Sequence, residues 1–197
     1  MAHSSGDARL VNLLGAVAIG LSDATVGDIA ADTALDSAAV AALVALLDLA
    51  RSGSVQALSQ FIGLSHSGTV RLVNRLSDAG LIRRSPGPDG RTAAVTLTRR
   101  GRTVASRIRA RRRAVTAATL DGLSEQQCDQ LTAICEALIA NLTSARLARR
   151  DAGRRPSGGA LCRMCDPVAC GRPAGDCPAA RAALGAHRAR SSPPSRA

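Results

Sequence analysis

Four cysteines near the C-terminus have spacings typical of a metal-binding segment. They follow the pattern C-x2-C-x4-C-x6-C and are Cys162, Cys165, Cys170 and Cys177. So short a segment, with little aliphatic side chain, cannot build a core, whereas four thiolates around one tetrahedral Zn²⁺ ion would supply the missing free energy of folding. An iron–sulfur cluster is the alternative cofactor for these thiolates, and unligated thiols in a disordered tail are the third interpretation. We expect zinc.

The other two cysteines and the start of the chain indicate a cytoplasmic protein. Cys128 and Cys135 lie in an apolar helical stretch, as small core residues do. The apolar run Leu10–Leu21 follows a basic residue, but Asp7 cancels that charge and Asn12 interrupts the run. We interpret it as an amphipathic helix and not as a signal peptide. With no run of membrane-span length, we expect no membrane partner, and we expect the six cysteines to be thiols or metal ligands.

Positive charge is concentrated in two blocks of the chain. The 26 basic side chains, all arginine, exceed the 15 acidic ones and give a net charge of +11. Residues 1–50 carry −5 and residues 51–115 carry +12, after which residues 116–148 carry −3 and residues 149–197 carry +7. A basic block within a folded region is typical of a surface that binds a polyanion, and a solvated charged face is the alternative. With a single aromatic residue, the chain is poorly suited to stack the bases of single-stranded nucleic acid.

The middle of the chain predicts three helices. Asp36 and Ser37 begin the first, in which apolar residues recur every three or four positions. Ser54 is the expected N-cap of the second helix, Gly63 ends it, and Ser65 caps the third. The buried stripe of the third helix consists of Thr69, Leu72, Val73 and Leu76. Two helices joined by a tight glycine turn make a helix-turn-helix.

A β-hairpin is expected directly after these helices. Leu81–Arg84 and Thr92–Leu97 have the composition of short strands, and Pro86–Gly90 between them is rich in turn formers. The order of helix, turn, helix and hairpin is that of a winged helix.

Two long helical stretches follow the hairpin. Residues 102–120 have a sparse apolar face, and arginines cover the rest of that helix. Ser124 and Gln127 form a capping box for the next helix. Its apolar residues keep helical spacing and are Leu131, Ile134, Cys135, Leu138, Ile139 and Leu142. Such a stripe suits a dimer interface, and burial within one subunit is the alternative.

Several short motifs in this order resemble the MarR family of bacterial transcriptional regulators. They are LSHSGTVRLVNRL at 64–76, GLI at 80–82, DGR at 89–91 and LTRRG at 97–101, within a resemblance that covers roughly residues 37–145. The resemblance implies a mainly α fold with a small β-hairpin wing, an α+β winged helix-turn-helix in which the first helix and the last two build a dimerisation lobe. It also implies a small-molecule effector in a cleft between the two lobes. Asn74 stands where the family usually has Asp, and Gly68 sits early in the recognition helix.

We divide the chain accordingly. A winged-helix DNA-binding and dimerisation domain spans 1–152, with the helix-turn-helix at about 54–80, the wing at about 81–97 and dimer helices at about 8–21, 102–122 and 124–149. A linker at 153–160 leads to a Cys-rich metal-binding tail at 161–187, and residues 188–197 are expected to be disordered.

The predicted base contacts lie on the third helix, opposite its buried stripe. They are Ser67, Val70, Arg71 and Asn74, which a helix in the major groove would present to the base edges. Arg71 is expected to read guanine, Asn74 adenine and Val70 a thymine methyl. His66 is interpreted as a polar residue at the start of this helix, and we include it among the expected DNA-binding residues.

The predicted backbone contacts flank that helix. Ser65, Arg75, Arg83 and Arg84 are placed for phosphates, which set register and affinity. Arg91, at the tip of the hairpin, is expected to enter the minor groove, and Asp89 to orient Arg75 or Arg91.

These features together predict a homodimer that binds a pseudo-palindromic operator in double-stranded DNA and represses transcription. Two alternatives remain: a regulator whose input is metal or redox chemistry at the Cys-rich tail, and a non-specific architectural DNA-binding protein. The sequence has no catalytic triad, zinc-protease motif or phosphate-binding loop, so we expect no enzyme.

Overall fold

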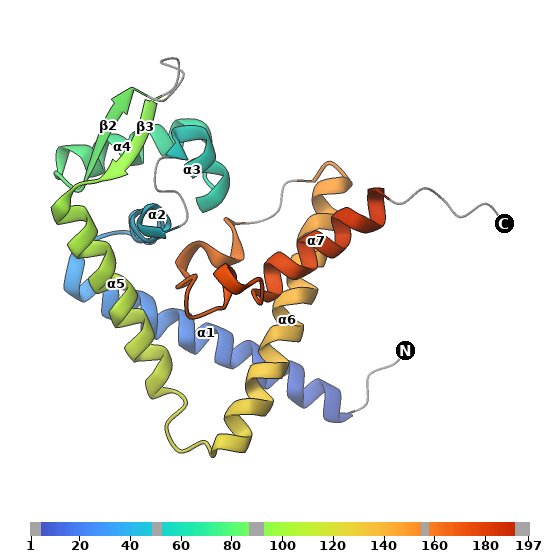
Figure 1. The fold of residues 1–197 in the computed structure, drawn as a ribbon. Helices are drawn as coiled ribbons and strands as arrows, with labels where there is room; N and C mark the ends of the chain where they lie inside the picture. The colour runs from blue at the N-terminus through green and yellow to red at the C-terminus, as the bar shows by residue number, and fades with distance from the viewer. Residues whose placement is uncertain (1–4, 49–52, 87–92, 155–157, 192–197) are drawn as a thin grey trace.

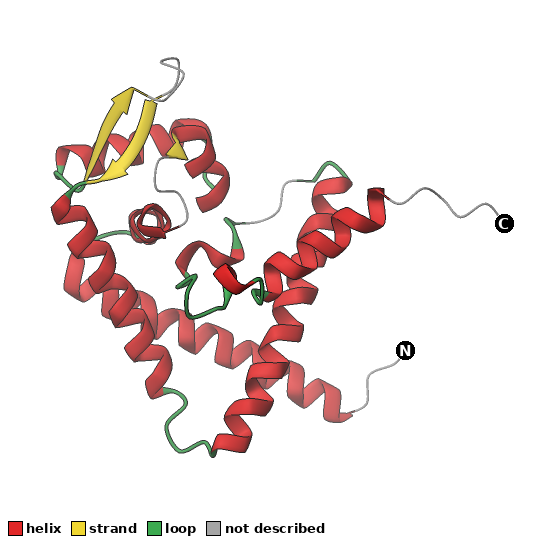
Figure 2. Ribbon diagram, in the orientation of Figure 1, coloured by secondary structure: helices red, strands yellow, loops and turns green. Residues whose placement is uncertain are grey.

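The computed structural model describes residues 5–48, 53–86, 93–154 and 158–191 and is mainly helical (Figure 1). The elements are α1 (Ser5–Thr33), α2 (Ser37–Asp48), β1 (Gly53–Ser54), α3 (Val55–Ile62), α4 (His66–Asp78), β2 (Ile82–Pro86), β3 (Ala93–Leu97), α5 (Arg99–Ala118), α6 (Glu125–Asp151), the 3-10 helices η1 (Leu161–Met164) and η2 (Arg172–Ala174), and α7 (Pro178–Ser191). The strands lie together at one end of the molecule (Figure 2). The mainly α fold with a small antiparallel sheet confirms the expected winged helix.

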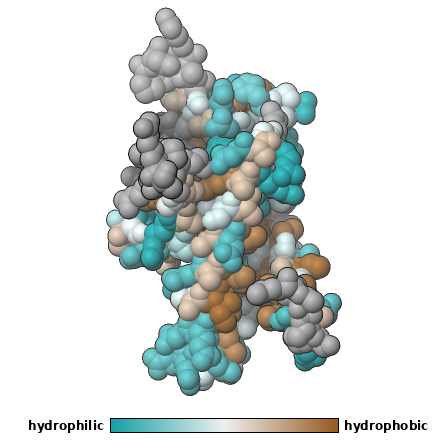
Figure 3. Space-filling model, turned by 90° about the vertical axis from the view of Figure 1, so that its right-hand side faces the viewer, coloured by the Kyte–Doolittle hydropathy of each residue, from teal (hydrophilic) through white to brown (hydrophobic). Residues whose placement is uncertain are grey.

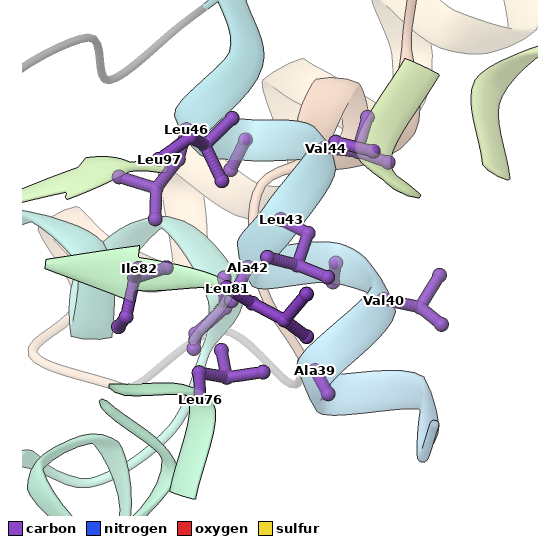
Figure 4. Packing of buried hydrophobic residues seen from close by; sticks show 14 of the residues in the cluster. Ala39, Val40, Ala42, Leu43, Val44, Leu46, Leu76, Leu81, Ile82 and Leu97 are labelled. Carbon is purple, nitrogen blue, oxygen red and sulfur yellow. The ribbon is translucent and has the colours of Figure 1, made fainter. Parts of the chain in front are cut away.

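The core of the molecule is built around α2. Every residue from Ala39 to Leu47 is buried, so this helix is apolar on all sides. The helices α3, α4 and α5, strand β3 and the 3-10 helix η1 all contact it. In Figure 4, Leu43 and Ala42 lie toward Leu81 and Leu76, and Leu46 lies beside Leu97. The winged helix is therefore assembled on one buried helix.

The helix-turn-helix begins and ends where the capping residues predict. The Ser54 side chain accepts a hydrogen bond from the Ala57 amide at 3.1 Å, and Gly63 ends α3 with a left-handed φ of 79°. Ser65 caps α4, whose buried residues are the predicted Thr69, Leu72, Val73 and Leu76. These local predictions are confirmed.

The sheet contains a strand that the sequence pattern did not predict. The hairpin pairs β2 with β3 antiparallel, from Ile82 opposite Leu97 to Pro86 opposite Ala93. The additional strand β1 pairs with the other edge of β3, which gives the order β1-β3-β2. Two residues are too few to show an alternating pattern, so only the tertiary fold reveals this strand.

A glycine allows the start of the wing and α5 to meet closely. Thr98 caps α5 by accepting from the Gly101 amide at 3.0 Å, and its hydroxyl donates to the Gly80 carbonyl oxygen at 2.7 Å. A Cβ added at Gly101 would overlap the carbonyl oxygen of Leu81. Residues 97–101, with the motif LTRRG, therefore form a tightly packed junction. Only glycine fits at the last position of this motif.

Ion pairs join α5 to α1 beneath this junction. Arg107 lies 2.9 Å from Asp32 and Arg111 lies 2.9 Å from Asp28. From the wing, α5 runs to a short connection, α6 returns in the opposite direction, and α7 packs along α6 (Figure 1). Part of the negative charge of residues 1–50 thus neutralises part of the arginine block.

Three expected boundaries need correction. The first helix, expected at about 8–21, spans Ser5–Thr33, because the ion pairs with α5 stabilise the polar turns after the apolar run. The tail is not a separate unit, because Met164 packs against the core cluster and η1 contacts α2. The helix α7 extends to Ser191, so the expected disordered segment at 188–197 begins too early, and residues 192–197 lie outside the described part.

Within the described part of the chain, two helices reach membrane-span length, contrary to expectation. The segments Asp7–Ile29 and Glu125–Asp151 are long and apolar enough to cross a membrane by length and composition alone. Neither apolar window is buried within the chain. These two surfaces are the apolar faces that another molecule could cover.

We predict that Gly101→Ala lowers the free energy of unfolding by about 1–3 kcal/mol, because the added methyl group would displace the backbone at Leu81. Chemical denaturation measures the change. The matched control is Gly185→Ala in α7, where an added Cβ meets nothing within 4 Å. Equal stability of the two variants would contradict the close junction.

Candidate nucleic-acid interface

The exposed face of α4 carries the predicted base-reading residues. Ser67, Arg71 and Asn74 are exposed and Val70 is half-buried, while the predicted stripe on the opposite side is buried. The structure therefore brings these four side chains to one face of a single helix. Such a face, of about the width of the major groove, can present an arginine, an amide and a methyl-bearing side chain to base edges.

The N-terminus of α4 is fixed by the side chain of Ser65. Its hydroxyl oxygen accepts a hydrogen bond from the Gly68 amide at 3.1 Å and lies 3.3 Å from the Ser67 hydroxyl. Ser65 therefore positions the first turn, and it remains exposed there. His66 is the first residue of α4 and is also exposed, as expected of a polar residue at a helix start.

Arg75 is held by an acidic partner that sequence reasoning did not identify. Its Nη2 donates to Asp36 Oδ2 at 2.8 Å, and the other oxygen of Asp36 accepts from the Ala39 amide at 2.8 Å. The bond from Ala39 lowers the pKa of Asp36, partial burial opposes this, and Arg75 lowers the pKa further. Asp36 thus both caps α2 and orients an arginine at the edge of α4.

The base of the wing adds two exposed arginines on β2. Arg83 Nε donates to the Thr96 hydroxyl across the hairpin at 3.2 Å, which directs its guanidinium along the sheet. Arg84 is exposed on the next position of the same strand. The predicted wing-tip residues Asp89 and Arg91 lie outside the described residues.

Further arginines cluster where α5 begins, and the expected contacts did not include them. Arg99, Arg100 and Arg102 are exposed in the first turn of α5, and Arg100 Nη1 donates to the Ala79 carbonyl oxygen at the end of α4 at 3.3 Å. Arg99 and Arg100 belong to the motif LTRRG, and Arg102 follows it directly, but the motif alone does not show which of its side chains are exposed.

The arginines in the middle of α5 form contacts within the protein. Arg107 and Arg111 pair with α1, Arg109 lies 3.8 Å from Asp166, and Arg112 Nη1 donates to the Met164 carbonyl oxygen at 3.1 Å. The arginines of residues 51–115 therefore fall into two groups. One group is exposed near α4 and the wing, and the other forms contacts that connect α5 to α1 and to the tail.

Two clefts lie between the winged helix and the long helices. One of about 910 Å³ is bounded by α3, the start of α4, α6 and the tail, and includes Arg146, Arg150 and Arg154 in its lining. The other, of about 380 Å³, lies among α1, α2, α5 and η1. Both volumes are in the range of small-molecule sites. The tail forms part of the wall of each.

The helix-turn-helix and the first part of the hairpin match a known family model. Residues 49–92 match the model of the MarR family. Over this stretch the chain is similar to MarR-family proteins. No curated protein sequence matches the chain.

Solved MarR-family structures share the fold over most of their length. A MarR family protein from Bacillus stearothermophilus is 22% identical with a TM-score of 0.65, covering 73% of this chain and 99% of its own. A MarR family protein of Mycobacterium tuberculosis is 26% identical with a TM-score of 0.53, covering 67% and 95%. CouR from Rhodococcus jostii, solved bound to p-coumaroyl-CoA, is 22% identical with a TM-score of 0.50, covering 64% and 88%.

The four tail cysteines lie near one another beside the winged helix. Burial raises the pKa of the Cys165 thiol, Arg112 opposes the effect, and Cys162, Cys170 and Cys177 raise it further. Burial also raises the pKa of Cys170, and the neighbouring Cys177 raises it further. Within the described ranges, no three Cys, His, Asp or Glu side chains are gathered closely enough to hold a metal ion in this conformation.

We predict that Asp36→Asn lowers stability at neutral pH by at most about 1 kcal/mol, because the asparagine oxygen can still cap α2 but the charge that pairs with Arg75 is lost. Since folding lowers the pKa of Asp36, its charge stabilises the fold above the unfolded pKa, and this contribution disappears as pH falls through the folded pKa. Urea unfolding of both proteins between neutral and acidic pH tests this. A difference that grows toward acidic pH would contradict the assignment.

Proposed function

We propose that this protein is a sequence-specific regulator of transcription that binds a pseudo-palindromic operator as a homodimer and acts as a repressor. The observation that carries the proposal is the exposed face of α4 in a MarR-family winged helix, flanked by arginines of β2 and α5. A dimer seated on its operator would exclude other proteins from the same stretch of duplex, which is the simplest route to repression. We assign the protein no catalytic role.

Base recognition is assigned to the middle of α4. Arg71 has the donor pair that guanine accepts in the major groove, and Asn74 has the amide that pairs with adenine. Val70 offers a methyl contact to thymine. These three positions lie on the exposed side of the helix while the opposite side is anchored in the core.

Phosphate binding is assigned to the arginines around α4. Arg83 and Arg84 lie on β2, and Arg99, Arg100 and Arg102 lie at the start of α5. Arg75 is oriented by Asp36 and remains exposed, so it can reach a phosphate beside the groove. Such contacts release counterions and make affinity fall steeply with salt.

Dimerisation is supported by the apolar surface of the long helices. Leu10, Val11, Val17 and Ile19 on α1 are each more than half exposed, and α6 buries none of its residues within the chain. Figure 3 shows hydrophobic surface gathered in the lower half of one face. A second copy of the chain would bury these side chains, each worth about 1.5–3 kcal/mol when fully covered.

A second subunit explains the two apolar helices better than a lipid bilayer does. Asp28 and Asp32 of α1 are ion-paired with α5, and α6 packs against α7. Helices with ion pairs and packing contacts of this kind are poorly suited to a lipid bilayer. We therefore propose that the protein is cytoplasmic, because that is the compartment in which a regulator binds DNA.

The larger cleft is our candidate for an effector site. It lies between the winged helix and α6, so a bound molecule would touch both the DNA-binding and the dimerisation elements. Its arginines favour an anionic ligand. The related fold of CouR holds p-coumaroyl-CoA, which is a molecule of that charge, although its identity to this chain is only 22%.

We predict dissociation constants of about 10⁻⁸ M or below for the operator near 0.15 M salt, at least about 10³-fold tighter than for a scrambled duplex. Genome-wide mapping of bound DNA supplies the operator, and fluorescence anisotropy measures both affinities over a salt series. Equal affinity for the two duplexes would favour a non-specific architectural protein and overturn the regulator.

Arg71→Ala should weaken operator binding by about 1–3 kcal/mol and reduce discrimination at one base pair of each half-site. The matched control is Arg113→Ala, an exposed arginine of α5 that is about 14 residues, or roughly 21 Å of helix, beyond the start of α5. The same titration reports both variants. Equal losses in the two would contradict recognition by α4.

We further predict a solution mass of about twice the chain mass of 20.1 kDa, measured by light scattering after size-exclusion chromatography. Leu142→Asp, which places a charge on the exposed apolar face of α6, should shift the protein toward the monomer. Val168→Asp is the control, because Val168 is 77% exposed and lies in the tail, outside the helices of the expected interface. A wild-type monomer at micromolar concentration would overturn the dimer.

A further inference from the structure

The four tail cysteines lie in two successive turns. Cys162 and Cys165 form one part, a tight turn in which the Cys165 amide donates to the Cys162 carbonyl oxygen at 3.0 Å. Cys170 and Cys177 form the other part, in which the Cys170 thiol donates to the Pro167 carbonyl oxygen at 3.4 Å. The turns between Cys170 and Cys177 use Gly171 and Gly175, both with left-handed φ. The first pair has the C-x2-C spacing of a zinc knuckle, and the second pair supplies the two further thiols that a four-thiolate site needs.

The two parts already contact each other. Arg172, which lies between Cys170 and Cys177 in sequence, approaches the sulfur of Cys162 with its Nη1 at 3.7 Å. The four sulfur atoms therefore share one region, although they are not close enough to coordinate an ion as placed. Closing the site requires the two pairs to approach one another by a local adjustment of the loop between them.

The loop buries few hydrophobic side chains of its own. Cys177 is buried, but Val168 is 77% exposed, and among the other hydrophobic residues from 161 to 177 none is buried. A folded segment with so small a core usually depends on a metal or a cross-link. Binding Zn²⁺ to four thiols releases four protons and leaves a centre with a net charge of −2, which Arg172 would partly offset.

The tail also touches the turn of the helix-turn-helix. The Ala160 amide donates to the Phe61 carbonyl oxygen at 2.7 Å, near the end of α3. A Cβ on Gly159 would lie 2.5 Å from that same oxygen, and a Cβ on Gly63 would overlap the backbone of Gly158 and Gly159. The chain leading into the cysteine loop is thus packed directly against the connection between α3 and α4.

Arginines of the long helices hold the other side of the tail. Arg146 Nη2 on α6 donates to the Gly159 carbonyl oxygen at 2.6 Å, and Arg112 on α5 donates to the Met164 carbonyl oxygen at 3.1 Å. Asp166 adds an ion pair with Arg109 of α5 at 3.8 Å. The tail therefore bridges the helix-turn-helix to both long helices that follow the wing.

We propose that Cys162, Cys165, Cys170 and Cys177 bind one Zn²⁺ ion, and that this ion keeps the tail docked between the helix-turn-helix and the long helices so that zinc occupancy controls operator affinity. The regulatory half of this proposal rests on the DNA-binding function proposed above. A docked tail limits the motion of α4 relative to the dimer helices. Loss of zinc would reduce the fraction of dimers whose two recognition helices have the spacing of the operator, which lowers apparent affinity in proportion.

Metal content tests the site without reference to DNA. Full-length protein purified without oxygen or chelators should be colourless and contain about one zinc per chain by elemental analysis. Cys165→Ser and Cys170→Ser should each lose the metal, whereas Cys128→Ser, which removes a thiol of α6, should retain it. Metal-free wild-type protein would overturn the site. A brown protein with visible absorption and bound iron would overturn the zinc assignment in favour of an iron–sulfur cluster.

Operator titrations then test the coupling. Zinc-depleted wild-type protein and Cys165→Ser should bind the operator about 5–150-fold more weakly than zinc-loaded protein, with the same salt slope because the phosphate contacts are unchanged. Circular dichroism and the dimer mass establish that the variant is folded, and depletion and reloading of the wild-type chain provide a measurement that needs no substitution. Unchanged affinity despite zinc loss would overturn the coupling and leave the metal site standing.

The variant Gly159→Ala distinguishes the effect of tail docking on operator affinity from the effect of zinc binding. All four thiols remain, so zinc should still bind, but the added methyl group would push the tail away from Phe61. We expect this variant to reproduce the loss of operator affinity with zinc in place. Wild-type affinity in Gly159→Ala would overturn the proposed contact. If zinc-loaded wild-type protein shows no preference for the operator, the DNA-binding function fails instead, and the metal analysis still decides the site.

Discussion

The burial of α2 on all sides is the constraint on which the rest of the structure depends. A helix of alanine, leucine and valine has no face that can remain in water, so other elements must surround it. The recognition helix, the wing strand β3, α5 and the tail segment η1 all pack on it. Because they share this support, the exposed face of α4 is held in a fixed position relative to the described part of the wing strands.

Some arginines of this protein are paired with acidic residues, and others keep their charge on the surface. The acidic residues Asp28 and Asp32 neutralise arginines in the lower part of α5, and Asp36 orients Arg75 at the edge of α4. The arginines near the wing keep their charge on the surface. Exposed pairs of this kind contribute little to stability, so their main effect is to fix where positive charge is presented.

The tail adds a connection between distant parts of the winged helix. A segment that starts after α6 returns to the α3–α4 turn, where glycines permit backbone-to-backbone contact, and then passes along α5. It also lines both clefts between the winged helix and the long helices. The two clefts and the four tail cysteines therefore lie at the same junction between α4 and the long helices.

The sequence by itself determined the local structure of the winged helix. Ser54, Gly63, Ser65 and the Ser124 capping box predicted helix ends because a cap acts through hydrogen bonds within one turn, and the stripe on α4 predicted its exposed face because helical periodicity is also local. Only the tertiary structure decided the partners of the arginines, the short strand β1, the length of α1 and the docking of the tail. These depend on residues far apart in the chain, such as Arg75 and Asp36 or Ala160 and Phe61, whose proximity no local pattern records.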